Sequence, residues 1–148
     1  MSHSLTKIWF HAVFRTKNSL PLITKNIEDK LFRCLIDLLS NELSCVVRII
    51  NGTSNHIHIL FLLNPNYALK DVMHRIKGSS SHWINQNDLT ENKFAWQIGY
   101  GAFSVSESKL KVVELYIANQ KEHHKKITFN EEYEAFIEKH GLVFVKNG

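Results

Sequence analysis

The sequence predicts an α+β fold in which an antiparallel sheet carries two helices on one face and leaves the other face free for a site. Strand-like and helix-like segments follow one another in the order β-α-β-β-α-β, which is the split βαβ arrangement. The turn signal Asn51-Gly52-Thr53-Ser54 lies between two apolar runs and predicts an antiparallel hairpin. No internal repeat, linker or low-complexity segment interrupts the 148 residues, so we expect residues 1–148 to form a single domain.

The first half of the chain supplies a helix between strands. Residues 5–16 alternate as a strand does, and residues 27–43 repeat apolar side chains at the spacing of an amphipathic helix. The two runs beside the turn signal span residues 45–50 and 56–63, and both are rich in residues that favour strands. We therefore expect the run at 56–63 on an inner strand of the sheet.

The second half supplies the remaining elements. An apolar stripe predicts a helix over residues 67–84, and a strand is expected over residues 96–103. Residues 106–124 contain no glycine or proline and repeat apolar side chains at helical spacing, which predicts a helix. The tail predicts a short helix at residues 131–140, followed by an added edge strand at residues 141–145.

Two histidines interrupt the apolar run of the inner strand. Side chains alternate along a strand, so His56 and His58 project from one face while Ile57 and Ile59 take the other. Two imidazoles at this spacing suit a divalent metal ion, because a formed strand already organises them. The alternative is a half-exposed strand with two hydrogen-bonded histidines, and a metal site needs a third ligand and a reacting group.

The predicted helix at residues 106–124 supplies candidates for both. Tyr116 and Gln120 occupy positions i and i+4, so the phenol and the carboxamide share one helix face, about one turn apart. A phenol is a nucleophile and a carboxamide oxygen is a metal ligand. The alternative is that both are ordinary polar residues on a helix surface.

The H-x-H pattern on a strand and the Y-x-x-x-Q pattern on a later helix resemble those of the single-tyrosine HUH transposases of the smallest bacterial insertion sequences and of their repeat-associated relatives. Segments at residues 8–17, 76–81 and 96–106 resemble further parts of that family in the same order. One residue departs from the pattern, because Asn55 stands where members often carry aspartate. Asparagine still accepts a hydrogen bond from an imidazole N–H, but it removes a charge from beside the metal.

This resemblance implies a DNA transposase that cleaves and rejoins single-stranded DNA with hairpin ends through a 5′-phosphotyrosine intermediate. It implies Mg²⁺ or Mn²⁺ as the cofactor, and a homodimer in which the tyrosine helix of one subunit completes the metal site of the other. It also implies a ferredoxin-like or RRM-like sheet with a tyrosine-bearing helix towards the C-terminus. The implied roles are nucleophile for Tyr116 and metal ligands for His56, His58 and Gln120.

The formal net charge of +4 by itself only slightly favours a nucleic-acid partner. Basic residues follow the first strand, surround the second predicted helix and follow the tyrosine, with aromatic residues among them. Such residues either form a groove that follows phosphates and stacks unpaired bases, or make ordinary solvated faces. We expect phosphate contacts from Arg15, Lys17, Arg75, Lys77 and Lys121.

Two other functions compete with the transposase interpretation. A split-βαβ module that binds single-stranded nucleic-acid hairpins without catalysis, as a decayed or domesticated element, fits the same pattern. A hydrolytic phosphoesterase built on H-x-H alone does not fit. The two-motif phosphoesterases need a second histidine followed two residues later by serine or threonine, and this sequence has none. The histidine-triad hydrolases need histidine at the position that Leu60 occupies here.

The remaining observations concern the compartment. Cys34 and Cys45 lie in apolar surroundings without the C-x-x-C spacing, which indicates small core side chains in a reducing compartment. No apolar run approaches the ~20 residues that a membrane helix needs, and we recognise no secretory or transit segment before the first strand. We expect a soluble cytoplasmic protein without a membrane partner.

Overall fold

The computed structural model describes residues 4–141, and its centre is a four-stranded antiparallel sheet with the strand order β2-β3-β1-β4. The strands are β1 (Trp9–Arg15), β2 (Val46–Gly52), β3 (His56–Leu62) and β4 (Gly101–Val105). The predicted α+β fold is confirmed, and β3 is an inner strand between β2 and β1, as expected.

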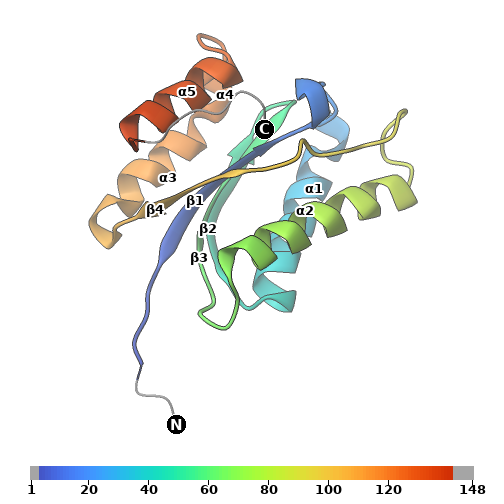
Figure 1. Ribbon diagram of the computed structural model, residues 1–148. Coiled ribbons are helices and arrows are strands. Elements are labelled where there is room, and N and C mark those ends of the chain that lie inside the picture. The colour runs from blue at the N-terminus through green and yellow to red at the C-terminus, as the bar shows by residue number, and fades with distance from the viewer. Residues whose placement is uncertain (1–3, 142–148) are drawn as a thin grey trace.

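Helices lie on both sides of this sheet (Figure 1). They are α1 (Lys25–Asp37), α2 (Leu69–Gln86), α3 (Leu110–Ala118), α4 (Gln120–His123) and α5 (Phe129–Lys139). Short helical turns occupy Lys17–Ser19, Leu38–Glu42 and Glu107–Lys109. None of the helices within residues 4–141 is long and apolar enough to cross a membrane.

Helices α1 and α2 cover one face and bury the larger apolar cluster. Ile57 and Ile59 of β3 are fully buried in it, together with Leu31 and Leu35 of α1 and Met73 of α2. Burying a side chain of this size contributes about 1.5–3 kcal/mol. This layer therefore fixes the position of β3, the strand that carries the histidine pair.

The opposite face was expected to be free, and that expectation is wrong, because α3, α4 and α5 cover it (Figure 1). Leu110 and Ile117 of α3 are buried there against Trp9 of β1 and Leu60 of β3. These apolar side chains explain the cover, since they stabilise the fold only when α3 lies on the sheet. The face that carries His56 and His58 is consequently closed from solvent.

Two predicted elements differ from the structure, and a third lies almost entirely outside the described residues. The helix expected over residues 106–124 is broken at Asn119, whose φ of −95° and ψ of 14° are not helical and whose residue type favours helix ends. The strand expected over residues 96–103 begins only at Gly101, because Gly99 has a φ of 91° and turns the chain. The edge strand expected at residues 141–145 lies, apart from Gly141, outside the described residues.

The two cysteines are free, with Cys45 buried and Cys34 half-buried. Burial raises the pKa of the Cys34 thiol to about 11, with a further contribution from Asp37, and burial also raises the pKa of Cys45. Both thiols therefore remain protonated at neutral pH and pack as small apolar groups.

Candidate active site

The two histidines of β3 project towards the helices α3 to α5, on the same face as Leu60. Both imidazoles are fully buried, while Ile57 and Ile59 point to the other face. This is the alternation that the sequence predicted. Because β3 is hydrogen-bonded on both edges, the two side chains start from a rigid backbone.

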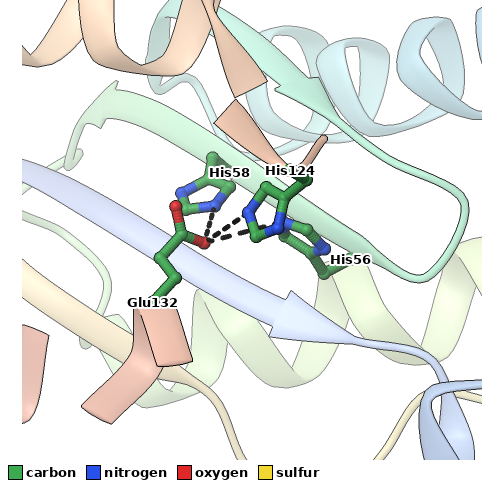
Figure 2. Close-up of side chains that lie close together, drawn as sticks. All are labelled: His56, His58, His124 and Glu132. Atoms are coloured by element: carbon green, nitrogen blue, oxygen red, sulfur yellow. Dashed lines mark hydrogen bonds and ion pairs between the residues drawn. The ribbon is translucent and has the colours of Figure 1, made fainter. Parts of the chain in front are cut away.

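Two residues from the C-terminal helices complete a cluster around the histidine pair (Figure 2). Glu132 of α5 places Oε1 3.0 Å from His58 Nε2 and 3.0 Å from the Nε2 atom of His124, which follows α4. The same oxygen lies 3.6 Å from His56 Nε2. One ligand atom from each of the four residues lies within 4.8 Å of the others, so the group is compact enough to surround one metal ion.

The outer nitrogen of each histidine is held by a neighbour. His56 Nδ1 lies 2.8 Å from Asn55 Oδ1, and His124 Nδ1 donates to the Ile127 carbonyl oxygen at 3.0 Å. His58 Nδ1 lies 2.7 Å from the Nε2 atom of the buried His11. Histidines that bind metals usually donate their second N–H to such a partner, as His124 does to the Ile127 carbonyl oxygen.

This arrangement shows how Asn55 takes part despite being an amide. Its Oδ1 accepts hydrogen bonds from Thr53 Oγ1 at 3.1 Å and from His56 Nδ1 at 2.8 Å. Thr53 Oγ1 also lies 2.9 Å from the same His56 nitrogen. The orientation of the His56 ring is therefore retained, and only the charge that an aspartate would add is missing.

The donor atoms at the centre fit a divalent metal ion. His124 uses its outer nitrogen as a donor to a carbonyl, so its inner nitrogen faces Glu132 Oε1 at 3.0 Å. His56, with its outer N–H on Asn55, presents a lone pair to Gln120 Oε1 at 3.1 Å. Two acceptor atoms this close need a cation or a proton between them. Burial, together with the neighbouring His58, lowers the pKa of His56 to about 3 and so disfavours the proton. Imidazole nitrogen and carboxylate oxygen are ligands of Mn²⁺ and other transition metals.

Tyr116 and Gln120 reach the same cluster from α3 and α4. The Tyr116 hydroxyl donates a hydrogen bond to Glu132 Oε2, and Gln120 Nε2 donates to that oxygen at 3.0 Å. The break at Asn119 does not separate them, because Gln120 remains fully buried below the tyrosine helix. The phenol and the carboxamide therefore meet beside the histidine pair within one chain.

Glu132 is the electrostatic centre of the site. Burial acts to raise the pKa of its carboxyl group, but hydrogen bonds from His58, Tyr116 and Gln120 outweigh that effect and hold the pKa well below its usual range. Burial raises the pKa of the Tyr116 phenol, and the bond to the negatively charged Glu132 raises it further. His123 Nε2 lies 3.4 Å from the phenol oxygen, so it is a second group to which the hydroxyl proton can pass.

A basic pocket of about 600 Å³ opens beside the cluster, next to Asn55 and His124. Lys121, one of the residues predicted to contact phosphate, lines it and forms an ion pair with Glu28 at 2.6 Å. The pocket is also lined by Lys25, Lys125 and Lys126. The pocket therefore places four lysines beside His124.

The other four predicted phosphate contacts lie elsewhere. Arg15, at the end of β1, donates to Ser19 Oγ at 2.9 Å, and Lys17 is exposed in the following turn. Arg75 and Lys77 are on α2, across the sheet from the cluster. Arg75 forms an ion pair with Glu42 at 2.6 Å. The contact of these four residues with DNA stays a prediction.

Lys77 has a structural role in addition. Its ammonium group donates to the carbonyl oxygens of Gln97 (2.8 Å) and Gly99 (2.5 Å). Burial lowers the pKa of this lysine. Lys77 thereby holds the turn that precedes β4 against α2.

One protein family matches most of this chain. The family model described as "Transposase IS200 like" matches residues 4–120. No curated protein matches the chain. The matched range includes His56, His58, Tyr116 and Gln120, whereas His124 and Glu132 lie beyond its end.

Two solved structures have a similar fold. One is a protein assigned as a transposase from Deinococcus radiodurans R1, with a TM-score of 0.63 and 19% identity, covering 81% of this chain and 95% of the other. The second is a REP-associated tyrosine transposase bound to a REP hairpin, with a TM-score of 0.63 and 13% identity, covering 86% of this chain and 76% of the other. At these identities the likeness shows the fold alone.

Proposed function

Because this chain belongs to the IS200-like transposase family, we propose that it is a DNA transposase that cleaves and rejoins single-stranded DNA through a covalent link to Tyr116. One observation carries the proposal. The Tyr116 hydroxyl and the imidazoles of His56 and His58 converge on a single carboxylate, so a nucleophile lies beside a cluster that fits a metal ion. Phosphodiester cleavage by a tyrosine needs these two elements side by side.

The metal would be held by His56 and His58, with Gln120 as the third ligand. Mn²⁺ or Mg²⁺ is the proposed ion, and Mn²⁺ suits imidazole ligands better. When bound, a divalent ion supplies charge neutralisation for the phosphate and for the departing oxygen. Gln120 Oε1 already lies 3.1 Å from His56 Nε2, which supports the carboxamide as a ligand.

The proposed cleavage transfers one phosphoryl group from the 3′ oxygen of the DNA to the Tyr116 oxygen. The Tyr116 oxygen attacks phosphorus, the bond from phosphorus to the 3′ oxygen breaks, and the 3′ oxygen leaves with the electron pair and takes up a proton. The phenol proton passes to Glu132 or His123, the two acceptors near the hydroxyl. The resulting 5′-phosphotyrosine keeps the bond energy, so a second 3′ hydroxyl can reverse the step and join new ends without ATP.

The proposed substrate is single-stranded DNA with hairpin ends. The basic pocket beside His124 supports this choice, because its lysines can follow a phosphate backbone up to the cluster. The solved REP-associated tyrosine transposase was bound to a REP hairpin, which supports a hairpin substrate here. A homodimer belongs to the proposal as well, and light scattering of the purified protein tests it.

The experiment that tests the function looks for the covalent adduct. Protein is incubated with Mn²⁺ and single-stranded oligonucleotides from the DNA that flanks its own gene, then analysed by denaturing electrophoresis and mass spectrometry. We expect an adduct on Tyr116 that a chelator abolishes. Tyr116→Phe should lose the adduct and keep DNA binding, whereas the control Tyr67→Phe, at an exposed position, should keep both. Specific hairpin binding without any adduct would replace the proposal with a non-catalytic hairpin-binding protein.

A further inference from the structure

The carboxylate of Glu132 occupies the space between the histidines and the tyrosine. Oε1 faces the Nε2 atoms of His58 and His124, and Oε2 accepts hydrogen bonds from Tyr116 and Gln120. Only 2% of the Glu132 surface is exposed. In the proposed cleavage, a phosphate must touch the same two groups, because one of its oxygens needs the metal and its phosphorus needs the tyrosine.

The spacing of Oε1 is that of a metal ligand. In an octahedral site with metal–ligand bonds of about 2.1 Å, neighbouring ligand atoms lie roughly 3.0 Å apart. Oε1 lies 3.0 Å from the Nε2 atoms of His58 and His124, and 3.6 Å from that of His56. Glu132 Oε1 therefore lies where a carboxylate ligand would lie, beside the imidazoles of His56, His58 and His124.

The position of this carboxylate has a consequence for catalysis. A catalytic metal ion needs a coordination position open for substrate, and a protein carboxylate that fills that position must leave before a phosphate oxygen can bind there. A phosphodiester and a carboxylate are both anionic, and each offers two oxygens. A phosphate bound beside His58 and Tyr116 would need the place that the Glu132 carboxylate occupies.

We propose that Glu132 is a metal ligand in the DNA-free protein and that the scissile phosphate takes its place, so that α5 is a built-in competitor of the substrate. This inference rests on the proposed function, because it concerns regulation of the same site. Replacement of the carboxylate would also free the Tyr116 hydroxyl. His123, 3.4 Å from the phenol oxygen, is then the acceptor that remains beside the tyrosine.

The packing of α5 allows such an exchange. Phe129 and Glu132 are its only buried residues, and the helix spans only Phe129–Lys139. Isolated helices of this length are marginally stable, so α5 depends on its contacts with the site. One such contact is Phe136, whose ring lies 5.2 Å from that of His11. Moving α5 therefore leaves the larger apolar cluster between α1, α2 and the sheet intact.

The first test measures Mn²⁺ binding without DNA, by calorimetry or by the electron paramagnetic resonance signal of free Mn²⁺. Glu132→Gln should weaken Mn²⁺ binding on the order of tenfold or more, since the amide loses the charge of a ligand. Glu134→Gln is the matched control, because Glu134 is an exposed residue of the same helix. Unchanged Mn²⁺ affinity in Glu132→Gln would overturn the assignment of Glu132 as a ligand.

The second test measures binding of a single-stranded oligonucleotide at saturating Mn²⁺ by fluorescence anisotropy. Glu132→Gln should bind DNA several-fold more tightly than the wild type, and more tightly than Glu134→Gln, which removes the same charge from the surface. Weaker DNA binding in Glu132→Gln than in Glu134→Gln would mean that Glu132 stays on the metal and would overturn the exchange. Circular dichroism checks that both variants are folded.

A third measurement needs no substitution. Hydrogen exchange of the wild type with Mn²⁺ should become faster across residues 129–139 when the oligonucleotide is added, because α5 loses its contact with the site. Slower or unchanged exchange there would contradict the proposal. The tyrosine adduct assay separates the two hypotheses: Mn²⁺ bound through Glu132 without any adduct refutes the proposed function alone, and an adduct with no effect of Glu132→Gln refutes this inference alone.

Discussion

Asn55 offers the sharpest test of how the histidine cluster is built, because it is the residue that departs from the family pattern. Substitution to alanine removes the oxygen that lies 2.8 Å from His56 Nδ1. Loss of a group that orients a metal-binding histidine typically lowers metal affinity 10- to 100-fold, about 1.4–2.7 kcal/mol. Thr53 Oγ1 lies 2.9 Å from the same nitrogen and can still accept a hydrogen bond from it. We therefore expect a loss of Mn²⁺ affinity at the lower end of this range, about tenfold.

Asn55→Asp should act in the opposite direction. The carboxylate would keep the hydrogen bond to His56 and make the imidazole a more basic ligand, so we expect Mn²⁺ affinity to rise. Both affinities are measured by calorimetric titration, with Ser54→Ala as a control at an exposed neighbouring position. Equal Mn²⁺ affinity in the wild type, Asn55→Ala and Asn55→Asp would refute the reasoning that the outer hydrogen bond of His56 controls the metal.

Two further predictions concern the free energy of unfolding, measured by chemical denaturation, of glycine and lysine variants. Gly52→Ala should destabilise the fold strongly and weaken Mn²⁺ binding, because its Cβ would lie only 2.1 Å from the backbone oxygen of His56. Gly78→Ala, by contrast, meets no atom within 4 Å inside α2 and should stabilise the fold by about 0.5–1 kcal/mol; equal effects of the two substitutions would contradict this account. Lys77→Met should cost about 1–3 kcal/mol by leaving the Gln97 and Gly99 carbonyls unpaired, whereas Lys70→Met at an exposed position should cost little, and equal losses would speak against the structural role of Lys77.

The first three strands and the histidine pair were predictable because they follow from strong local patterns. Alternation along β3 was sufficient to place His56 and His58 on one face and Ile57 on the other. The four-residue spacing of Tyr116 and Gln120 correctly brought them to one place, although the helix itself breaks between them. Helix propensity is a weak guide at such a position, although asparagine is a residue type that favours helix ends.

The contribution of His124 and Glu132 to the cluster was not predicted, because it depends on how segments distant in sequence pack together. His124 was one of two adjacent histidines, and nothing in the sequence showed that its ring would face His56, with ring centres 4.4 Å apart. The covered second face of the sheet has the same origin, because only the packing of α3 on Trp9 and Leu60 decides it.

Glu132, however, left a signal that the sequence analysis missed. It stands between Phe129 and Phe136 at helical spacing, with Tyr133 next to it, so it lies on the apolar stripe of α5. A carboxylate on an apolar stripe must find partners when the helix packs, because an isolated buried charge is strongly unfavourable. The partners it finds are imidazole nitrogens, a phenol and a carboxamide, the groups that the proposed reaction uses. The attachment of α5 therefore depends on the hydrogen bonds that Glu132 makes in the site. A ligand that binds the same imidazole, phenol and carboxamide groups more strongly than Glu132 will also weaken the attachment of the helix.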